Sequence, residues 1–184
     1  MSKVVVVYHS GYGHTQRMAQ SVAQGADAEL LAIDADGNLP EGGWDMLAAA
    51  DAIIMGSPTY MGSVSWQFKK FADASSKPWY SRAWADKVFA GFTNSASMNG
   101  DKLSTLHYFF TLAMQHSGVW VGSNVMPSNT KAAQRNDPNF LGSFAGAMAQ
   151  SPSDAGANEM PEGDLENARV LGKRVADMTV RLTK

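Results

Sequence analysis

Five short runs of apolar residues punctuate the chain, and each has the length of a β-strand. Residues 4–8 read Val-Val-Val-Val-Tyr, without a polar interruption. A run of this kind is typical of a strand that is buried on both faces, as in the centre of a parallel sheet. The other runs lie at residues 29–33, 52–55, 87–92 and 119–121. The pattern therefore predicts five strands.

Between these runs, apolar residues recur at every third or fourth position, which is the period of an amphipathic helix. The stripe is longest near the end of the chain, where Leu171, Val175 and Leu182 fall on one side of the expected helix. Comparable spacing predicts helices at residues 15–24, 64–74, 103–116 and 165–182.

Strand and helix alternate along the chain, and this order indicates the fold class. Right-handed crossovers join such strands into an α/β fold, a five-stranded parallel sheet with helices on both faces. Ligands of such sheets bind at the carboxyl ends of the strands. Three loops of unusual composition are expected there, at residues 10–14, 57–63 and 93–101.

The length of the chain, 184 residues, suits one domain and leaves no room for a second. Residues 123–163 are polar and rich in Pro, Gly, Ser and Asn. We therefore expect a single domain over residues 1–184 with a long loop or insertion at about 123–163. A loop of that length carries function, covers a site or assists assembly.

Composition and charge narrow the function. The chain is 45% hydrophobic and 17% charged, with a formal net charge of −2, so there is no electrostatic reason to expect a nucleic-acid partner. Cysteine is absent, which excludes thiol chemistry and Cys-ligated metals, and no metal site is predicted. The early apolar run is too short for a signal peptide or a membrane span. We expect a cytoplasmic protein without an integral membrane segment.

The first loop has the composition of a phosphate cradle. Residues 10–15 read Ser-Gly-Tyr-Gly-His-Thr and lead into the first predicted helix. Two glycines let backbone N–H groups turn inward, the hydroxyls add donors, and the helix amino end favours an anion by roughly 0.3 to 2 kcal/mol. Since the loop contains neither Lys nor Arg, a phosphate would be held here by neutral donors.

Other interpretations of this loop fit less well. No Gly-x-x-x-x-Gly-Lys-Ser/Thr string occurs, which excludes a P-loop nucleotide site. A dinucleotide fingerprint would use Gly11 and Gly13, with Asp34 as ribose partner, but Gln16 stands where its third glycine belongs. A phospho-receiver site would need acidic residues where His9 stands after the first strand. Taken alone, however, a glycine turn before a capped helix remains nearly as good an interpretation.

The first loop, together with Gly-Ser-Pro-Thr-Tyr-Met-Gly at residues 56–62, resembles the WrbA-type NAD(P)H:quinone oxidoreductases, FMN enzymes of the flavodoxin-like superfamily. The likeness continues through residues 67–73, through Trp79 and into the last helix. It implies a flavodoxin-like fold, a bound FMN, NADH or NADPH as co-substrate, and a quinone as acceptor. It also implies a homo-oligomer, with the tetramer as the family's usual form.

The resemblance further implies which residues form the site. The first loop would surround the FMN phosphate, the second would line the isoalloxazine ring, and the third would cover the ring's polar edge. The implied cofactor-binding residues are Ser10, Gly11, Tyr12, Gly13, His14, Thr15, Pro58, Thr59, Tyr60, Met61, Gly62, Asn94, Ser95, Ala96, Ser97, Met98 and Asn99.

Three residues are candidates for catalysis: Tyr60, Trp79 and His116. His116 stands where the family carries a histidine near the flavin, so it would stack on a quinone or donate a proton; a helix-end histidine stabilised by the helix dipole is the alternative. Trp79 would wall a substrate site of its own or a neighbouring subunit, and packing is the alternative.

The chain also departs from the family pattern. The family's second loop reads Pro-Thr-Arg-Phe-Gly-Asn, whereas residues 58–63 read Pro-Thr-Tyr-Met-Gly-Ser, so a cation beside the flavin is lost. The family's third loop is glycine-rich, and residues 95–100 keep only the last glycine. We expect these changes to reshape the substrate site more than they affect FMN binding.

The resulting functional prediction is an FMN oxidoreductase that passes two electrons from NADH or NADPH to a quinone or a similar flat acceptor in a ping-pong cycle. Two alternatives stay open. One is a flavodoxin-type electron carrier, and the other is a flavin-binding regulatory protein without turnover. Carriers rely on a strongly acidic surface for docking, which a net charge of −2 does not provide.

Overall fold

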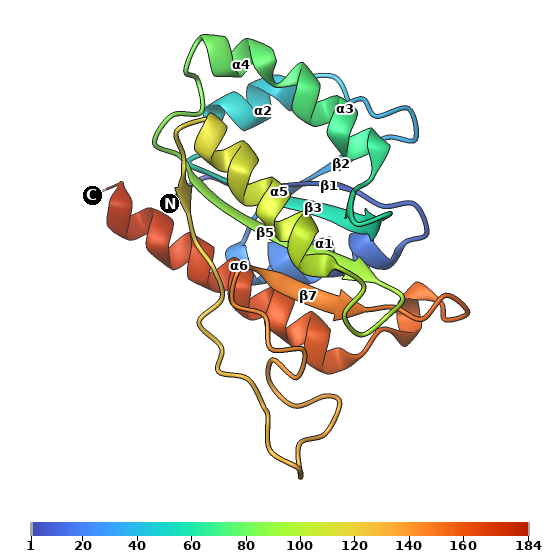
Figure 1. Cartoon of the computed structure of the whole chain (residues 1–184). Coiled ribbons are helices and arrows are strands. Elements are labelled where there is room, and N and C mark those ends of the chain that lie inside the picture. Colours follow the sequence, from blue (N-terminus) through green and yellow to red (C-terminus); the bar gives the residue numbers. More distant parts are fainter. Residues whose placement is uncertain (1, 184) are drawn as a thin grey trace.

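The computed structural model describes residues 2–183, and a parallel sheet forms its centre (Figure 1). The strand order is β2-β1-β3-β5-β6, and each neighbouring pair is parallel. These strands are β1 (Val4–His9), β2 (Glu29–Ile33), β3 (Ala52–Tyr60), β5 (Val88–Ser95) and β6 (Val119–Trp120). The predicted five-stranded parallel sheet is confirmed.

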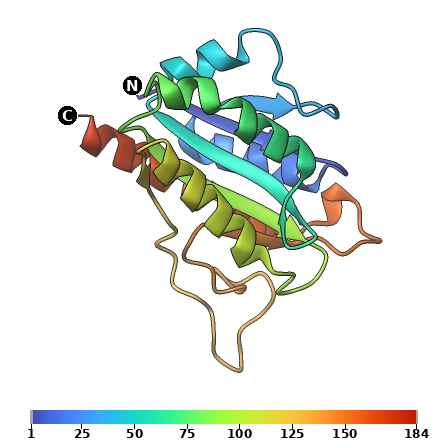
Figure 2. The ribbon, with the colours of Figure 1, turned by 45° about the horizontal axis from the view of Figure 1, so that its top comes forward.

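Helices cover both faces of this sheet (Figure 2). α1 (His14–Ala26) and α6 (Glu162–Leu182) pack together on one face, and α3 (Trp66–Ala74) and α5 (Lys102–Gln115) lie on the other. Two short helices, α2 (Gly43–Ala49) and α4 (Ser76–Tyr80), were not predicted because they bury too few side chains to show a periodic stripe. In residues 2–183, no helix is long and apolar enough to cross a membrane.

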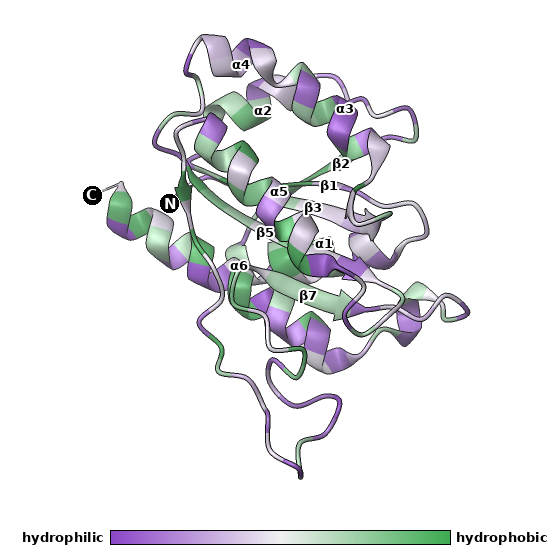
Figure 3. Ribbon diagram, viewed as in Figure 1, coloured by the Kyte–Doolittle hydropathy of each residue, from purple (hydrophilic) through white to green (hydrophobic). Residues whose placement is uncertain are grey.

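The valine side chains of β1 pack alternately into two separate hydrophobic cores. Val4 and Val6 belong to the cluster under α1 and α6, whereas Val5 and Val7 belong to the cluster under α3 and α5. Successive side chains of a strand point to opposite faces, so a strand between two helix layers needs apolar residues at every position. Figure 3 shows hydrophobic strands between helices that carry both hydrophobic and hydrophilic residues.

Two of the predicted loops begin inside strands. β3 continues to Tyr60 and turns back into the short antiparallel β4 (Ser63–Val64), with Tyr60 opposite Ser63. The two residues between them, Met61 and Gly62, have φ angles of 48° and 78°, as a tight hairpin turn requires. The expectation of a loop over residues 57–63 is therefore corrected to a strand and a two-residue turn.

The edge next to β5 is shared by two short strands. β6 pairs with the beginning of β5, at Val88 and Phe89, and β7 (Ala147–Gln150) pairs in parallel with its end. The chain between β6 and β7 leaves the sheet as an extended arm, visible below the sheet in Figure 1.

The predicted loop at 123–163 is thus corrected, because it contains β7 and a single helical turn, η1 (Ala157–Glu159), and α6 already begins at Glu162. β7 escaped prediction for a physical reason. It has four residues, and of these only Ala147 and Ala149 are fully buried, so its apolar signal is weak. Its position is fixed by pairing with β5.

Candidate functional site

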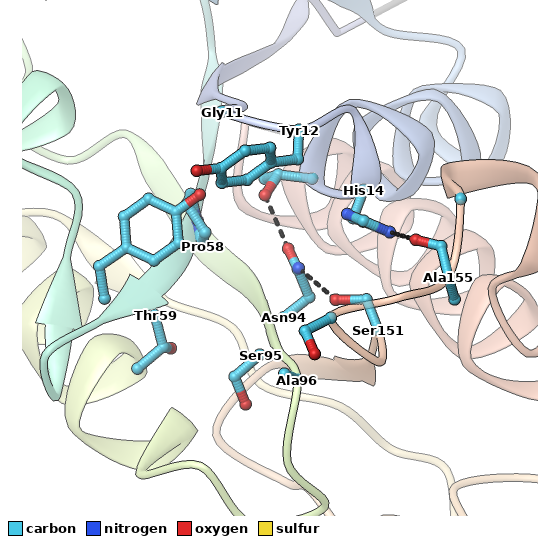
Figure 4. Close-up of a pocket in the computed structure, with 14 residues that line it drawn as sticks. Gly11, Tyr12, His14, Pro58, Thr59, Asn94, Ser95, Ala96, Ser151 and Ala155 are labelled. Carbon is cyan, nitrogen blue, oxygen red and sulfur yellow. Dashed lines mark hydrogen bonds between the residues drawn. The ribbon is translucent and has the colours of Figure 1, made fainter.

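A cavity of about 660 Å³ lies at the carboxyl ends of the strands (Figure 4). Its wall comes from four segments of the chain: the loop after β1, the end of β3, the end of β5, and the segment after β7. The lining residues are Gly11, Tyr12, His14, Thr15, Pro58, Thr59, Tyr60, Asn94, Ser95, Ala96, Ser151, Ser153, Ala155 and Gly156. Each of the three predicted loops contributes to it.

Ser10 shapes the first loop from inside. Its hydroxyl oxygen accepts hydrogen bonds from the backbone N–H groups of Gly13 and Gln16, both at 3.1 Å. Gly13 adopts a φ of 91° immediately before α1, a conformation that glycine reaches without steric cost. The sequence suggested that Ser10 and Gly13 face the phosphate, but the structure places both in the framework of the turn and outside the cavity lining.

The same turn leaves backbone donors unused. Within residues 2–183, the backbone N–H groups of Gly11, Tyr12, His14 and Thr15 make no hydrogen bond, and no side chain caps the start of α1. All of these residues line the cavity. Free amides at a helix amino end form a site for an anion, so this loop can bind a phosphate group.

Asn94 joins three parts of the wall. The Thr15 hydroxyl donates to Asn94 Oδ1 at 2.7 Å, and Asn94 Nδ2 donates to the Ser151 hydroxyl at 2.8 Å, as drawn in Figure 4. Asn94 is only 5% exposed. Because buried polar groups that keep all their partners are rigid, this bridge holds the phosphate loop, β5 and the segment after β7 at fixed spacing.

Two tyrosines stand at the mouth of the cavity. Tyr60 lies across the first loop so closely that a Cβ added to Gly11 would be 2.7 Å from the Tyr60 hydroxyl. A side chain at position 11 would therefore have to displace the Tyr60 ring. Burial, and to a lesser extent the neighbouring Tyr12, raise the pKa of Tyr60, so its phenol stays protonated at neutral pH and can donate a hydrogen bond. Tyr12 is 81% exposed.

Buried hydrogen bonds support the second loop from below. Thr59 Oγ1 is 2.9 Å from Thr93 Oγ1 and 2.8 Å from Thr105 Oγ1, which ties the end of β3 to β5 and α5. Ser65 Oγ lies 2.8 Å from His9 Nδ1 and ties the start of α3 to the end of β1. Burial lowers the pKa of His9, which keeps this imidazole neutral. The loop beside the cavity is therefore preorganised.

The fourth wall was not predicted. The segment after β7 contributes Ser151, Ser153, Ala155 and Gly156, and the His14 Nε2–H donates to the Ala155 carbonyl at 2.9 Å. The available signal was the run of Ser, Pro, Ala and Gly at residues 151–157, inside a long segment that was expected to cover a site or assist assembly. That composition does not indicate that this segment contacts the loop after β1.

Several predicted cofactor-binding residues lie near the cavity but do not line it. Met61 and Gly62 form the tip of the β3–β4 turn, and Met61 is fully exposed. Of the third loop, only Asn94, Ser95 and Ala96 line the cavity. The predicted residues outside the lining are Ser10, Gly13, Met61, Gly62, Ser97, Met98 and Asn99.

Trp79 and His116 lie at the opposite edge of the sheet. Helix α5 runs back along the parallel strands, so its last turn, followed by His116, is next to the beginning of β6. His116 is 4% exposed, its Nε2–H donates to Ser75 Oγ at 2.9 Å, and its ring lies 4.4 Å from that of Trp84. The half-exposed Trp79 lines a separate shallow groove there. The structure thus separates both residues from the cavity of their own chain.

The burial of His116 predicts an acid-sensitive fold. Burial lowers the pKa of His116 to about 4, from 6.5 for the free side chain, so the folded chain binds this proton less tightly than the unfolded chain. The stability contributed by the neutral ring is complete above the unfolded pKa and is lost as the pH falls through this window. We expect the free energy of unfolding, measured by urea titration, to fall by up to about 3 kcal/mol.

A matched pair of variants assigns this effect to His116. His116→Gln removes the titrating ring and should flatten the dependence of stability on pH between about 6.5 and 4. His107→Gln, at an exposed position of α5, is the matched control for the change from His to Gln. An unchanged slope in His116→Gln would contradict the assignment.

The free backbone amides of the first loop, the two tyrosines and the cavity at the carboxyl edge of a parallel sheet are features of a flavodoxin-like flavoprotein. The solved structure of the WrbA-like flavodoxin from Agrobacterium tumefaciens is 57% identical, with a TM-score of 0.81, and the match covers 98% of this chain and 99% of that one. The chain belongs to the WrbA-type NAD(P)H:quinone oxidoreductase family.

Other comparisons bear on the activity within this family. The family model described as NADPH-dependent FMN reductase matches residues 43–133. A protein named flavodoxin FldP, from Pseudomonas aeruginosa, is 58% identical over 96% of both chains. A protein named NAD(P)H dehydrogenase (quinone), from Geotalea daltonii, is 33% identical over 98% of both chains. These names support FMN-dependent redox chemistry and differ on the acceptor.

Proposed function

We propose that this protein is an FMN oxidoreductase that transfers two electrons from NADH or NADPH to a quinone or a similar flat acceptor, with both substrates using one site in turn. The observation that carries the proposal is the set of free backbone N–H groups of Gly11, Tyr12, His14 and Thr15, residues that line the cavity at the start of α1. The family model for NADPH-dependent FMN reductases supports it.

The residues of the cavity suit FMN. The free amides of the first loop would hold its phosphate, and Pro58 to Tyr60 would contact the flat ring, with Asn94 to Ala96 along the polar edge. A volume of about 660 Å³ lies within the range of cofactor sites. When bound there, FMN supplies the two-electron chemistry.

The chain's own residues position the partners and exclude water. The protonated Tyr60 phenol covers the first loop and can donate a hydrogen bond. The Asn94 bridge keeps the walls at fixed spacing. The exposed Tyr12 offers a flat surface at the mouth, where a planar nicotinamide or quinone would stack. Homo-oligomeric assembly and a cytoplasmic location are part of the same proposal.

A second function is favoured by one observation. A relative that is 58% identical carries the name flavodoxin, which suggests an electron carrier that docks to protein partners. Against this, the formal net charge of −2 provides little of the acidic surface on which such docking depends. A flavin-binding regulatory protein without turnover is the third candidate.

Steady-state kinetics separates these functions. We expect the purified FMN-bound protein to oxidise about one equivalent of NADH or NADPH without an acceptor, and to turn over continuously only when a soluble quinone is present. Because one pocket serves both substrates, double-reciprocal plots at several quinone concentrations should be parallel. Protein stripped of FMN serves as the control and should be inactive. FMN-bound protein that oxidises neither nucleotide would favour the carrier, and intersecting lines would require two separate substrate sites.

A further inference from the structure

A buried lysine lies directly behind the third loop. Lys102 is the first residue of α5 and is 1% exposed. Its ammonium group donates to Ser95 Oγ at 2.9 Å, to the Ser97 carbonyl at 2.7 Å and to the Met98 carbonyl at 2.9 Å. All three N–H groups of the ammonium are used, so the loop is wrapped around a single cation.

The helix dipole of α5 does not favour a cation at Lys102. The amino end of a helix carries partial positive charge and prefers an anion, and burying an ammonium is costly. Burial lowers the pKa of Lys102 to about 8, with Asp164 acting in the opposite direction and Arg135 adding to the decrease. The side chain is still mostly protonated at neutral pH. The charge is therefore held by the oxygen atoms of the loop and favoured by the Asp164 carboxylate.

Ser95 connects Lys102 to the cavity. Ser95 lines the cavity, its hydroxyl accepts from Lys102, and its carbonyl accepts from the Ser151 N–H at 2.9 Å. A Cβ added to Gly100 would be 2.1 Å from Ser95 Oγ, so the glycine leaves the room that this contact needs. Among the lining residues in the described part of the chain, none is Lys or Arg.

We propose that Lys102 is the cation of the flavin site, a positioning residue whose buried ammonium fixes the loop at residues 95–98 and stabilises the negative charge that bound FMN gains on reduction. The proposal rests on the proposed function, because it needs FMN in the cavity. It also gives the site a cation that neither the first nor the second loop contains.

The expected size of the effect follows from electrostatics. An ammonium held one side chain away from the cavity acts through a medium of low polarity, where charge interactions of a few kcal/mol persist over several ångströms. Removing the charge should weaken binding of reduced FMN relative to oxidised FMN by about tenfold. For a two-electron couple, tenfold corresponds to a fall of about 30 mV in the reduction potential.

Two neutral variants separate charge from hydrogen bonding. Lys102→Gln keeps N–H donors for the loop, and Lys102→Met keeps only the apolar stem. Lys173→Met, at an exposed site on α6, is the control with the same change in net charge. We expect both Lys102 variants to lower the two-electron potential of bound FMN, and the control to keep the wild-type value. Should Lys102→Met not fold, the Gln variant carries the measurement.

Hydrogen exchange on the FMN-free protein tests the positioning role separately. We expect amides of residues 95–101 to exchange faster in Lys102→Met than in wild type, and to be partly protected again in Lys102→Gln. A wild-type potential in both folded variants would overturn the electrostatic role, and unchanged exchange would overturn the positioning role. Wild-type protein that binds no FMN would instead overturn the proposed function, and the exchange result would still stand.

Discussion

Thr15→Asp should weaken FMN binding by about a thousandfold while leaving riboflavin binding almost unchanged. Thr15 lines the cavity at the start of α1, among the backbone amides that have no partner. A carboxylate there would repel a phosphate bound to these amides, and at a separation of about 4 Å such repulsion costs roughly 4 kcal/mol per unit charge. Riboflavin lacks the phosphate and escapes this repulsion. Fluorescence titration with the two flavins measures the ratio directly.

Thr15→Asn is the matched control, because Asn has the shape of Asp without its charge. The Asn Nδ2–H can still donate to Asn94 Oδ1, as the Thr15 hydroxyl does, whereas the Asp carboxylate only accepts. Riboflavin affinity, which does not involve the phosphate, therefore measures the effect of this bond in each variant. Thr15 is buried, so a carboxylate there costs stability that its place in the first turn of a helix only partly offsets. Circular dichroism of both variants therefore checks that they are folded. If Asp and Asn weaken FMN equally, the phosphate binds elsewhere.

The part of the fold that was predictable depends on local pattern. The valines of β1 predict a central strand, because alternate residues of the strand are buried in the two hydrophobic cores on either side of the sheet. The turn after β1 is also a local feature, since a glycine turn, hydroxyls and a following helix occupy consecutive positions; its binding of phosphate stays a prediction. The location of the cavity at the carboxyl edge followed from the alternation of strands and helices, because parallel α/β sheets bind ligands at that edge.

The part that escaped prediction depends on distant partners. β7 and the wall at residues 151–156 take their places from pairing with β5, more than 50 residues earlier in the chain. Lys102 was missed because cations were sought inside the loops, whereas its ammonium reaches the third loop from a helix. His116 was placed by resemblance, but the direction of α5 carries it to the other edge.

Arg135→Met should lower the free energy of unfolding by about 3 to 5 kcal/mol, because it leaves a buried carboxylate without its cation. Arg135 lies in the extended arm between β6 and β7, and its guanidinium binds both carboxylate oxygens of Asp164 at the start of α6. The Asp164 side chain is 1% exposed and that of Arg135 is 27% exposed. Without its partner, the Asp164 carboxylate therefore cannot reach solvent, whereas the Arg135 guanidinium can.

This asymmetry makes the prediction specific. Asp164→Asn keeps an acceptor for the Gln150 N–H, which donates to Asp164 at 2.9 Å, and it leaves Arg135 free to reach solvent. We expect it to cost about 1 to 2 kcal/mol, clearly less than Arg135→Met. The double variant should recover much of the loss, since both charges are gone. Urea unfolding of the four proteins gives the coupling energy.

The same ion pair should matter for the cofactor, since Gln150 precedes Ser151 in the wall of the cavity. Asp164 accepts from Gln150, and Gln150 in turn donates to the Ala96 carbonyl of the third loop at 3.3 Å. Loss of the ion pair should therefore increase the mobility of the segment after β7 and of the third loop, which both line the cavity. We expect Arg135→Met to bind FMN more weakly at a temperature where it is still folded, and the double variant to regain affinity together with stability. Equal destabilisation by Arg135→Met and Asp164→Asn, with FMN affinity unchanged in both, would show that the pair neither bears a buried charge nor supports the site.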